Sequence, residues 1–200
     1  MLTVYGDIYS GNCYKIKLLL KQLGQPYEWV HVNILEQETH TPEFLAKNPN
    51  GKIPVVELDN GTMLAESNAI IHYLAEGSAF LPNDRLAHAQ VLQWMFFEQY
   101  SHEPCIATSR YIVRYLGRPA EHEATLQQKI TQGYKALDVM EQHLKGRLFF
   151  VGGRYSIADI ALYAYTHVAQ EGCFDLTKYP NVRAWIERIR SQPGYVEMDG

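Results

Sequence analysis

The chain has 200 residues, of which 46% are hydrophobic and 20% charged, and its formal net charge is -4. This balance is typical of a globular protein with one large domain or two small ones. The negative charge, without any run of lysine and arginine, argues against a nucleic-acid partner. No apolar run approaches the ~18–20 residues of a membrane span and no signal-peptide pattern opens the chain, so we expect a cytoplasmic protein without a membrane partner.

The cysteines Cys13, Cys105 and Cys173 are odd in number and widely spaced. The sequence has no Cys-x-x-Cys motif and no histidine pair near a cysteine. It therefore supports neither a disulfide framework nor a zinc site, and we expect no metal cofactor.

The N-terminal part of the chain alternates strand and helix patterns. Residues Leu2–Tyr5 indicate a short strand, and apolar residues from near Asn12 then recur at helical spacing until Gly24, a typical helix stop. Tyr27–Val32 has the pattern of a second strand. The order predicts a compact βαβ unit with a right-handed crossover.

A second group of patterns follows. Thr41 before a proline predicts the start of a short helix. Val55–Leu58 and Thr62–Ala65 flank an Asp-Asn-Gly sequence, a strong hairpin signal. Ser67 then has the position of an N-cap for another apolar helix. This part of the chain therefore predicts a ββα unit.

Proline and glycine are concentrated in the segment that precedes the third predicted strand. Pro54 cannot donate a hydrogen bond to a sheet and restricts Ile53 to extended conformations, so we expect the Ile53 N–H and C=O to remain available to a bound peptide. A cis bond between them would reverse the chain and hold that edge still. Glu66 followed by Ser67 adds an acid and an anion-binding helix start. A rigid loop and an ordinary helix cap are the simpler interpretations.

Beyond a short stretch that loses periodicity, the chain has only helical patterns. Pro104 interrupts the first long pattern and is expected to kink or offset it. Ser156 and Asp159 form a capping box before a segment that is apolar nearly all round, which predicts a central buried helix. The helical patterns span Arg85–Tyr115, Glu123–Leu144, Ile157–Gln170 and Val182–Ser191.

The order βαβ-ββα, with Pro54 before the third strand and Glu66-Ser67 after the fourth, resembles the thioredoxin-like domain of a cytosolic glutathione transferase. The segment Gly153–Asp159 is similar to the capping element of that family's all-helical domain. The resemblance implies an α/β thioredoxin-like domain at residues 1–77, a linker at residues 78–84 and an all-α helical bundle at residues 85–200. It also implies a homodimer.

The resemblance further implies a site for glutathione as co-substrate, with a hydrophobic electrophile as the second partner. The backbone of Ile53, positioned by Pro54, would pair with the cysteinyl unit. Ser67 and its helix start would receive the γ-glutamyl carboxylate, and Glu66 the ammonium group. Lys52 would face the glycyl carboxylate.

Three residues at the start of the first helix compete for the role of stabilising the thiolate. Ser10 matches the theta-like pattern of the family, Ser10-Gly11-Asn12 the nu-like pattern, and Gly11-Asn12-Cys13 the beta-like pattern. Ser10 and Asn12 could donate hydrogen bonds to the thiolate, and Cys13 could form a mixed disulfide, with a lowered pKa if exposed at the helix N-terminus. The simpler interpretations are an N-cap for Asn12 and a small buried residue for Cys13.

The predicted function is conjugation of glutathione to an electrophilic small molecule. Cys13 and Asn12 would favour a glutathione-dependent disulfide reductase, and a non-catalytic ligand-binding or partner-binding protein could share the fold. Aromatic residues on the first long helical pattern are available to the second substrate, although such a stripe is more often core or dimer contact. Those candidates are Trp94, Phe97, Tyr100, Arg110 and Tyr111.

Overall fold

The computed structural model describes residues 1–199, which form two compact units. The first unit contains residues 1–78 together with the C-terminal segment from Pro193, and the second contains residues 79–192.

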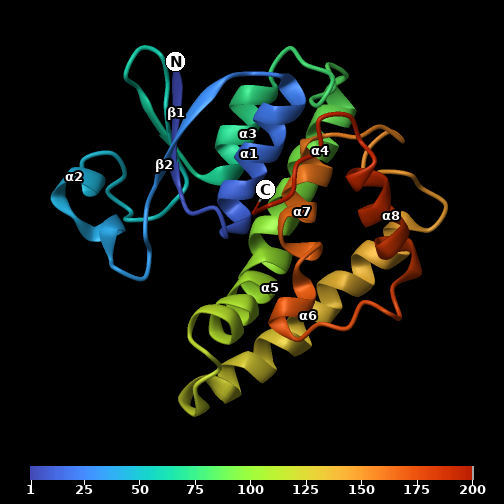
Figure 1. Ribbon diagram of the computed structural model, residues 1–200. Coiled ribbons are helices and arrows are strands. Elements are labelled where there is room, and N and C mark those ends of the chain that lie inside the picture. Colours follow the sequence, from blue (N-terminus) through green and yellow to red (C-terminus); the bar gives the residue numbers. More distant parts are fainter. Residues whose placement is uncertain (200) are drawn as a thin grey trace. The chain divides into compact units, whose positions relative to one another are not determined.

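The first unit is built around a four-stranded mixed sheet with the strand order β2-β1-β3-β4. β1 pairs in parallel with β2 and antiparallel with β3, which pairs antiparallel with β4. Two helices, α1 and α3, lie side by side on one face of the sheet, and the short α2 lies on the other side (Figure 1). The elements are β1 (Leu2–Gly6), α1 (Gly11–Leu23), β2 (Tyr27–His31), a 3-10 turn (Glu38–His40), α2 (Pro42–Leu45), β3 (Val55–Glu57), β4 (Met63–Ala65) and α3 (Ser67–Ala75).

Successive side chains of a strand point to opposite faces of the sheet, and here both faces are covered. In β1, Val4 is fully buried, whereas the half-buried Tyr5 points to the opposite face. On the face of Tyr5, Val32, Val55 and Phe44 of α2 form a small apolar cluster. The observed order of elements is the predicted βαβ-ββα.

α1 begins one residue before the predicted start, because Ser10 is its N-cap and accepts a hydrogen bond from the Cys13 N–H. It ends at Gly24, whose φ of 65° places it in the left-handed conformation that favours glycine. The predicted helix stop is therefore confirmed.

The second unit is all-helical (Figure 1). Its elements are α4 (Arg85–Phe97), a π-helical turn (Glu98–His102), α5 (Glu103–Arg110), a second π-helical turn (Tyr111–Tyr115), a 3-10 turn (Ala120–His122), α6 (Glu123–Leu144), α7 (Ile157–Thr166), a 3-10 turn (Ala169–Gly172) and α8 (Pro180–Arg190).

Pro104 interrupts the first long helical pattern as predicted. It lies in the first turn of α5, directly after the π-helical turn Glu98–His102. Proline has no N–H for the helical hydrogen bond, and its ring would clash with the carbonyl group one helical turn earlier. The wider π-helical turn before Pro104 avoids this clash. The pattern is therefore divided between α4 and α5.

α7 is the central helix of this unit, since every residue from Ile157 to Thr166 is buried. Its N-terminus has the predicted capping box, in which the Ser156 side chain accepts from the N3 backbone and the Asp159 side chain accepts from the Ser156 N–H. The predicted end at Gln170 is too late, because a separate 3-10 turn begins at Ala169.

The C-terminal tail packs with the first unit. The Tyr14 hydroxyl donates to the carbonyl of Val196 at 2.7 Å, and Lys17 Nζ donates to the carbonyl of Met198 at 2.9 Å. The predicted helical domain at residues 85–200 included this tail. Periodicity could not assign it, because its contacts are with α1, far away in the sequence.

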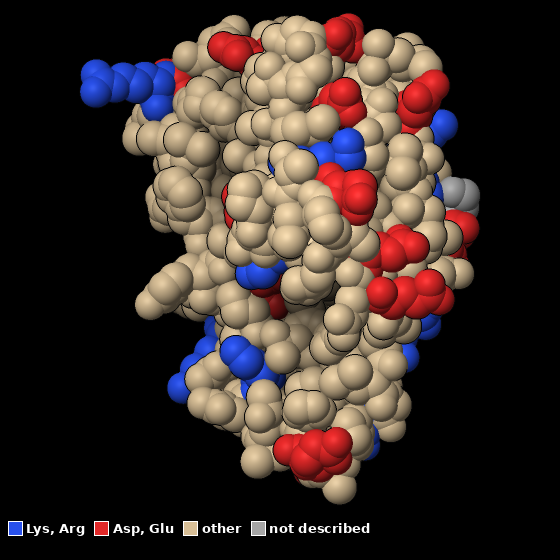
Figure 2. Space-filling view, turned by 90° about the vertical axis from the view of Figure 1, so that its left-hand side faces the viewer, with Lys and Arg blue, Asp and Glu red and all other residues tan. Residues whose placement is uncertain are grey.

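The distribution of charged side chains and the hydropathy of the helices agree with the ordinary globular composition of the chain. Acidic and basic side chains are interspersed on the face shown in Figure 2. Within residues 1–199, no helix is both long enough and apolar enough to cross a membrane.

Candidate functional site

The turn before β3 presents an open stretch of backbone. The Ile53–Pro54 peptide bond is cis, and Ile53 is half-buried. A hydrogen bond within the turn stabilises it, since the Asn48 side-chain amide donates to the carbonyl of Lys52 at 2.7 Å. Within residues 1–199, the Ile53 N–H and C=O make no hydrogen bond. The turn can therefore offer a donor and an acceptor to an extended peptide.

Lys52 and Glu66 are charged residues whose side chains have no hydrogen-bond or ion-pair partner among the described residues. Both side chains are exposed. Both can therefore bind ligand groups of opposite charge without first breaking an internal interaction.

Glu66 has an unusual backbone conformation. Glu66 has a φ of 67° and a ψ of 110°. A positive φ is strained for any residue other than glycine, because the Cβ atom is crowded by the backbone. Glu66 occupies the N-cap position of α3 but its side chain makes no capping hydrogen bond. The prediction that Ser67 is the cap is therefore wrong, because Ser67 is already the first helical residue.

Ser67 is buried, and its hydroxyl connects the starts of α1 and α3. Its Oγ donates to Asn12 Oδ1 at 3.2 Å and accepts a hydrogen bond from Lys15 Nζ at 3.1 Å. Lys15 Nζ also donates to Asn68 Oδ1 at 3.2 Å. This network brings together two predicted site residues, Ser67 and Asn12, that are far apart in the sequence.

Lys15 and Asn68 were missed by the sequence analysis. Lys15 has no exposed surface, although its neighbours along α1 are apolar and equally buried. The sequence carries no clear signal for Lys15, because α1 contains three lysines and the pattern does not show which of them is buried and needs partners.

Ser10 and Asn12 lie at the positive end of α1, where the first N–H groups of the helix point outward. Both are half-buried. The Ser10 Oγ accepts from the Cys13 N–H at 3.4 Å, which leaves its own proton to donate. Their positions suit the stabilisation of an anion such as a thiolate.

Cys13 has the opposite environment. It has no exposed surface, and burial raises the pKa of its thiol to about 12, although the Ser10 hydrogen bond acts to lower it. A Cβ placed on Gly6 would lie 2.7 Å from the Cys13 Sγ, so the sulfur is closely packed. The lowered pKa expected for an exposed thiol at a helix N-terminus does not apply, because desolvation outweighs the helix field.

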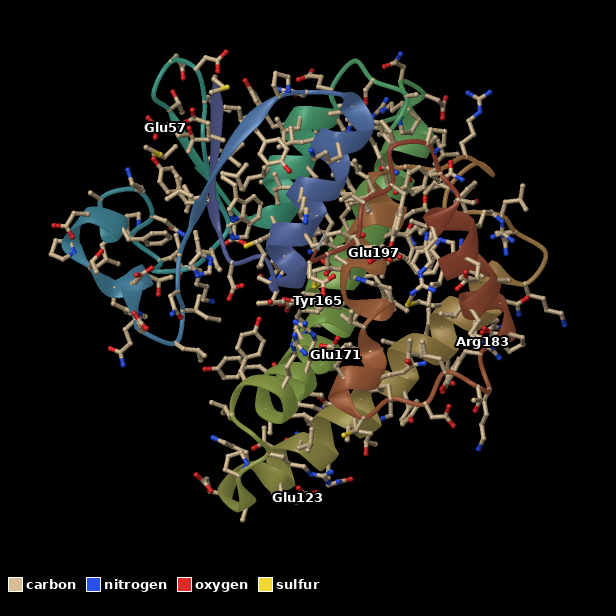
Figure 3. All side chains as sticks on the ribbon, viewed as in Figure 1. Glu57, Glu123, Tyr165, Glu171, Arg183 and Glu197 are labelled. Atoms are coloured by element: carbon tan, nitrogen blue, oxygen red, sulfur yellow. The ribbon has the colours of Figure 1, made fainter. Side chains whose placement is uncertain are left out.

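The candidates for the second-substrate site on α4, α5 and the π-helical turn between them do not share one environment. Trp94 is buried and packs on Phe150 with ring centroids 4.6 Å apart, whereas Tyr100 is 89% exposed. Arg110 is buried, and its Nε donates at 2.8 Å to Glu171, which Figure 3 shows beside α5. Trp94 therefore packs in the core, and Arg110 is occupied by an ion pair.

No group of three or more histidine, cysteine, aspartate or glutamate residues within residues 1–199 has a geometry that could hold a metal ion.

Two family models match the chain. The model for the glutathione S-transferase N-terminal domain matches residues 4–79, and the model for the C-terminal domain of the same family matches residues 87–193. The chain belongs to the glutathione S-transferase family. The predicted family and fold class are thus confirmed, with a thioredoxin-like first domain and a helical second domain.

Solved structures and curated relatives agree with this membership. A glutathione S-transferase from Pseudomonas fluorescens [Pf-5] is 59% identical, with a TM-score of 0.97, and the match covers 98% of each chain. A glutathione transferase family member from Pseudomonas fluorescens pf-5, solved with two glutathione bound, is 28% identical, with a TM-score of 0.83, and the match covers 96% of the present chain and 89% of that chain. The disulfide-bond oxidoreductase YfcG of Escherichia coli (strain K12) is 32% identical over 94% of the present chain and 91% of its own length.

Proposed function

We propose that this transferase binds glutathione on its first unit and conjugates it to a hydrophobic electrophile. The observation that supports this most directly is the open backbone of Ile53 beside the cis Pro54, in a chain of this family. The cysteinyl unit of glutathione would pair with Ile53 in the manner of an added strand.

The charges on the first unit suit the two ends of the tripeptide. The γ-glutamyl carboxylate would bind at Ser67 and the first amides of α3, and its ammonium group at the exposed carboxylate of Glu66. Lys52 would pair with the glycyl carboxylate. The side chains of Glu66 and Lys52 make no hydrogen bond or ion pair within residues 1–199, so in this proposal both are available to bind the ligand.

Ser10 and Asn12 would stabilise the glutathione thiolate by hydrogen bonds at the N-terminus of α1. A free thiol has a pKa of ~8.5, and donors near a helix N-terminus favour its ionised form. The thiolate then attacks the electrophilic carbon, a carbon–sulfur bond forms, and the leaving group departs with the displaced electron pair. The burial of Cys13 favours a packing role for that residue.

Conjugation to an aryl halide such as chlorodinitrobenzene tests this function. We expect a rate that saturates with glutathione and exceeds the uncatalysed rate at the same pH. A rate equal to the buffer control with several unrelated electrophiles would contradict conjugation, while leaving glutathione binding to be judged by direct titration.

A second candidate, glutathione-dependent disulfide reduction, is favoured by the similarity to the disulfide-bond oxidoreductase YfcG. A first glutathione thiolate would attack the substrate disulfide to give a mixed disulfide and one free thiol. A second would release the other thiol and form oxidised glutathione. Reduction of bis-hydroxyethyl disulfide, coupled to glutathione reductase and NADPH, distinguishes the candidates by comparing its kcat/KM with that for the aryl halide.

A further inference from the structure

Lys15 is a buried cation at the centre of the hydrogen-bond network between α1 and α3. It has no exposed surface, and its Nζ lies 3.1 Å from Ser67 Oγ and 3.2 Å from Asn68 Oδ1. A buried ammonium group is costly unless it is paired or hydrogen-bonded, so these contacts fix its position.

The ammonium group determines the direction of the neighbouring hydrogen bonds. Because it can only donate, Ser67 Oγ must accept from Lys15 and direct its single proton elsewhere. The available acceptor is Asn12 Oδ1, at 3.2 Å. The side-chain oxygen of Asn12 therefore faces Ser67, so the atom turned toward the Ser67 hydroxyl is the amide acceptor and not the amide donor.

We propose that Lys15 is a positioning and specificity residue for glutathione, acting through Ser67 and Asn12. Its charge favours a γ-glutamyl carboxylate at the start of α3, and its hydrogen bond holds Asn12 in the orientation that directs the amide donor away from Ser67. This inference rests on the proposed function, which places that carboxylate at Ser67 and the thiolate beside Asn12.

A comparison of the charge of Lys15 with the partial charge of the α3 N-terminus supports this role. The N-terminus of a helix carries only about half a positive charge, which falls off within the first turn. A full charge one hydroxyl group away from the carboxylate position, in a poorly screened site, adds to it. Ser67 already donates its proton to Asn12, so Lys15 supplies an attraction that the hydroxyl alone does not.

The matched control is Lys17, which lies on the same helix and is also buried but donates to the carbonyl of Met198 in the C-terminal tail. Lys15→Met and Lys17→Met each remove one buried ammonium group from α1. Only the first removes it from the Ser67 network. Both variants are first compared with the parent by thermal unfolding, to confirm that they fold.

Calorimetric titration would compare glutathione with an analogue that carries γ-aminobutyryl in place of γ-glutamyl and so lacks the α-carboxylate. The parent and Lys17→Met should bind glutathione more tightly than the analogue. Lys15→Met should lose roughly tenfold or more in glutathione affinity but change little in its affinity for the analogue, so that the preference shrinks to what the first amides of α3 supply. A purely structural role for Lys15 would weaken both ligands alike and preserve the preference.

Lys15→Gln separates the charge from the orientation, because its amide can still donate to Ser67. It should reduce the carboxylate preference as Lys15→Met does, but in NMR spectra recorded without ligand it should shift the Asn12 side-chain amide signal less than Lys15→Met does. An unchanged preference in both Lys15 variants would overturn the assignment of Lys15 alone. A parent protein that binds neither ligand would overturn the proposed function as well.

Discussion

Ser10 and Cys13 lie near each other at the start of α1 but differ in their access to a ligand. Ser10 is half-buried, and Cys13 is fully buried with the pKa of its thiol raised to about 12. We predict that Ser10→Ala lowers the rate of aryl-halide conjugation roughly tenfold or more, as expected when a group that contacts the developing thiolate is removed. Cys13→Ala should change it less.

Mass spectrometry after incubation with oxidised glutathione gives the counter-test for these residues. Stoichiometric glutathionylation of Cys13, together with loss of turnover in Cys13→Ala, would contradict the assignment to Ser10. The unfolding temperature of Ser10→Ala serves as a control, since loss of this N-cap alone costs about 1 kcal/mol of stability.

Glu66 combines a proposed ligand-binding role with a strained backbone conformation. Glu66→Ala and Glu66→Gly both remove the carboxylate and should both weaken glutathione binding. Glycine also relieves the strain at a φ of 67°, so Glu66→Gly should be more stable than Glu66→Ala by roughly 1 kcal/mol in denaturant unfolding. Equal stability of the two variants would show that the strain is not significant, and unchanged glutathione affinity would remove Glu66 from the site.

The candidate site was predictable from the sequence where its residues are marked by local chemistry. Proline and glycine identified the turn at Ile53, and an acid before a serine identified the start of α3. The Lys15–Ser67 hydrogen bond was not predictable, because it depends on two helices meeting in space. The burial of Cys13 was also open, because the residue belongs to the apolar set of the helix but lies at the helix start, where a side chain can be exposed.

Among the elements, the start of α7 is connected to its surroundings through the buried carboxylate of Asp159. This carboxylate accepts from the Phe150 and Ser156 N–H groups and from Trp185 Nε1 at 2.9 Å. Asp159→Ala leaves these buried donors without a partner, so we expect a loss of several kcal/mol, on the order of 3, in the free energy of unfolding.

Burial also makes the contribution of Asp159 depend on pH. It raises the pKa of this carboxyl from 3.8 to about 6, so the folded state binds more protons than the unfolded state between these values. Stability from this group therefore falls as pH rises from about 4 to about 6 and then levels off. Unfolding of the parent and Asp159→Asn at several pH values should show the parent's advantage shrinking through that window, and an advantage that grows would contradict the assignment.

The capping box was predictable because Ser156 and Asp159 are close in sequence. The donation from Trp185 was not, because it joins α7 to a residue of α8. Pro104 predicted a break in the long helix, but the sequence did not show that the turn before it would be π-helical.

At the scale of the whole molecule, the second unit has an exposed apolar surface on α4, the following turn and α6. Tyr100 is 89% exposed and Val139 45%, and both line a hollow together with Phe97 and Ala136. Phe96, near the end of α4, is 69% exposed. We propose that a second copy of the chain covers this surface. Light scattering should then give a mass near twice 23.0 kDa.

Substitutions on this surface provide the control for the dimer. Tyr100→Glu should shift the mass toward that of one chain, because it places a charge in the buried interface. Leu148→Glu, at a 56% exposed position outside the proposed interface, should leave the mass unchanged. A parent mass near 23.0 kDa would contradict the proposal.

The order of elements could be predicted over most of the chain, since strand alternation, helical spacing and caps are local properties. The division into units was less accessible at the C-terminus, where Tyr14 and Lys17 hold the tail to α1. Local periodicity contains no information about such distant contacts.

The most direct test of the central claim is calorimetric titration of the purified protein with millimolar glutathione, followed by thermal unfolding at the same concentrations. The account predicts saturable heat with one site per chain and an unfolding temperature that rises with glutathione concentration, since a ligand that binds the folded state stabilises it. Absence of both binding heat and a thermal shift would contradict a glutathione site at Ile53, Glu66 and Ser67.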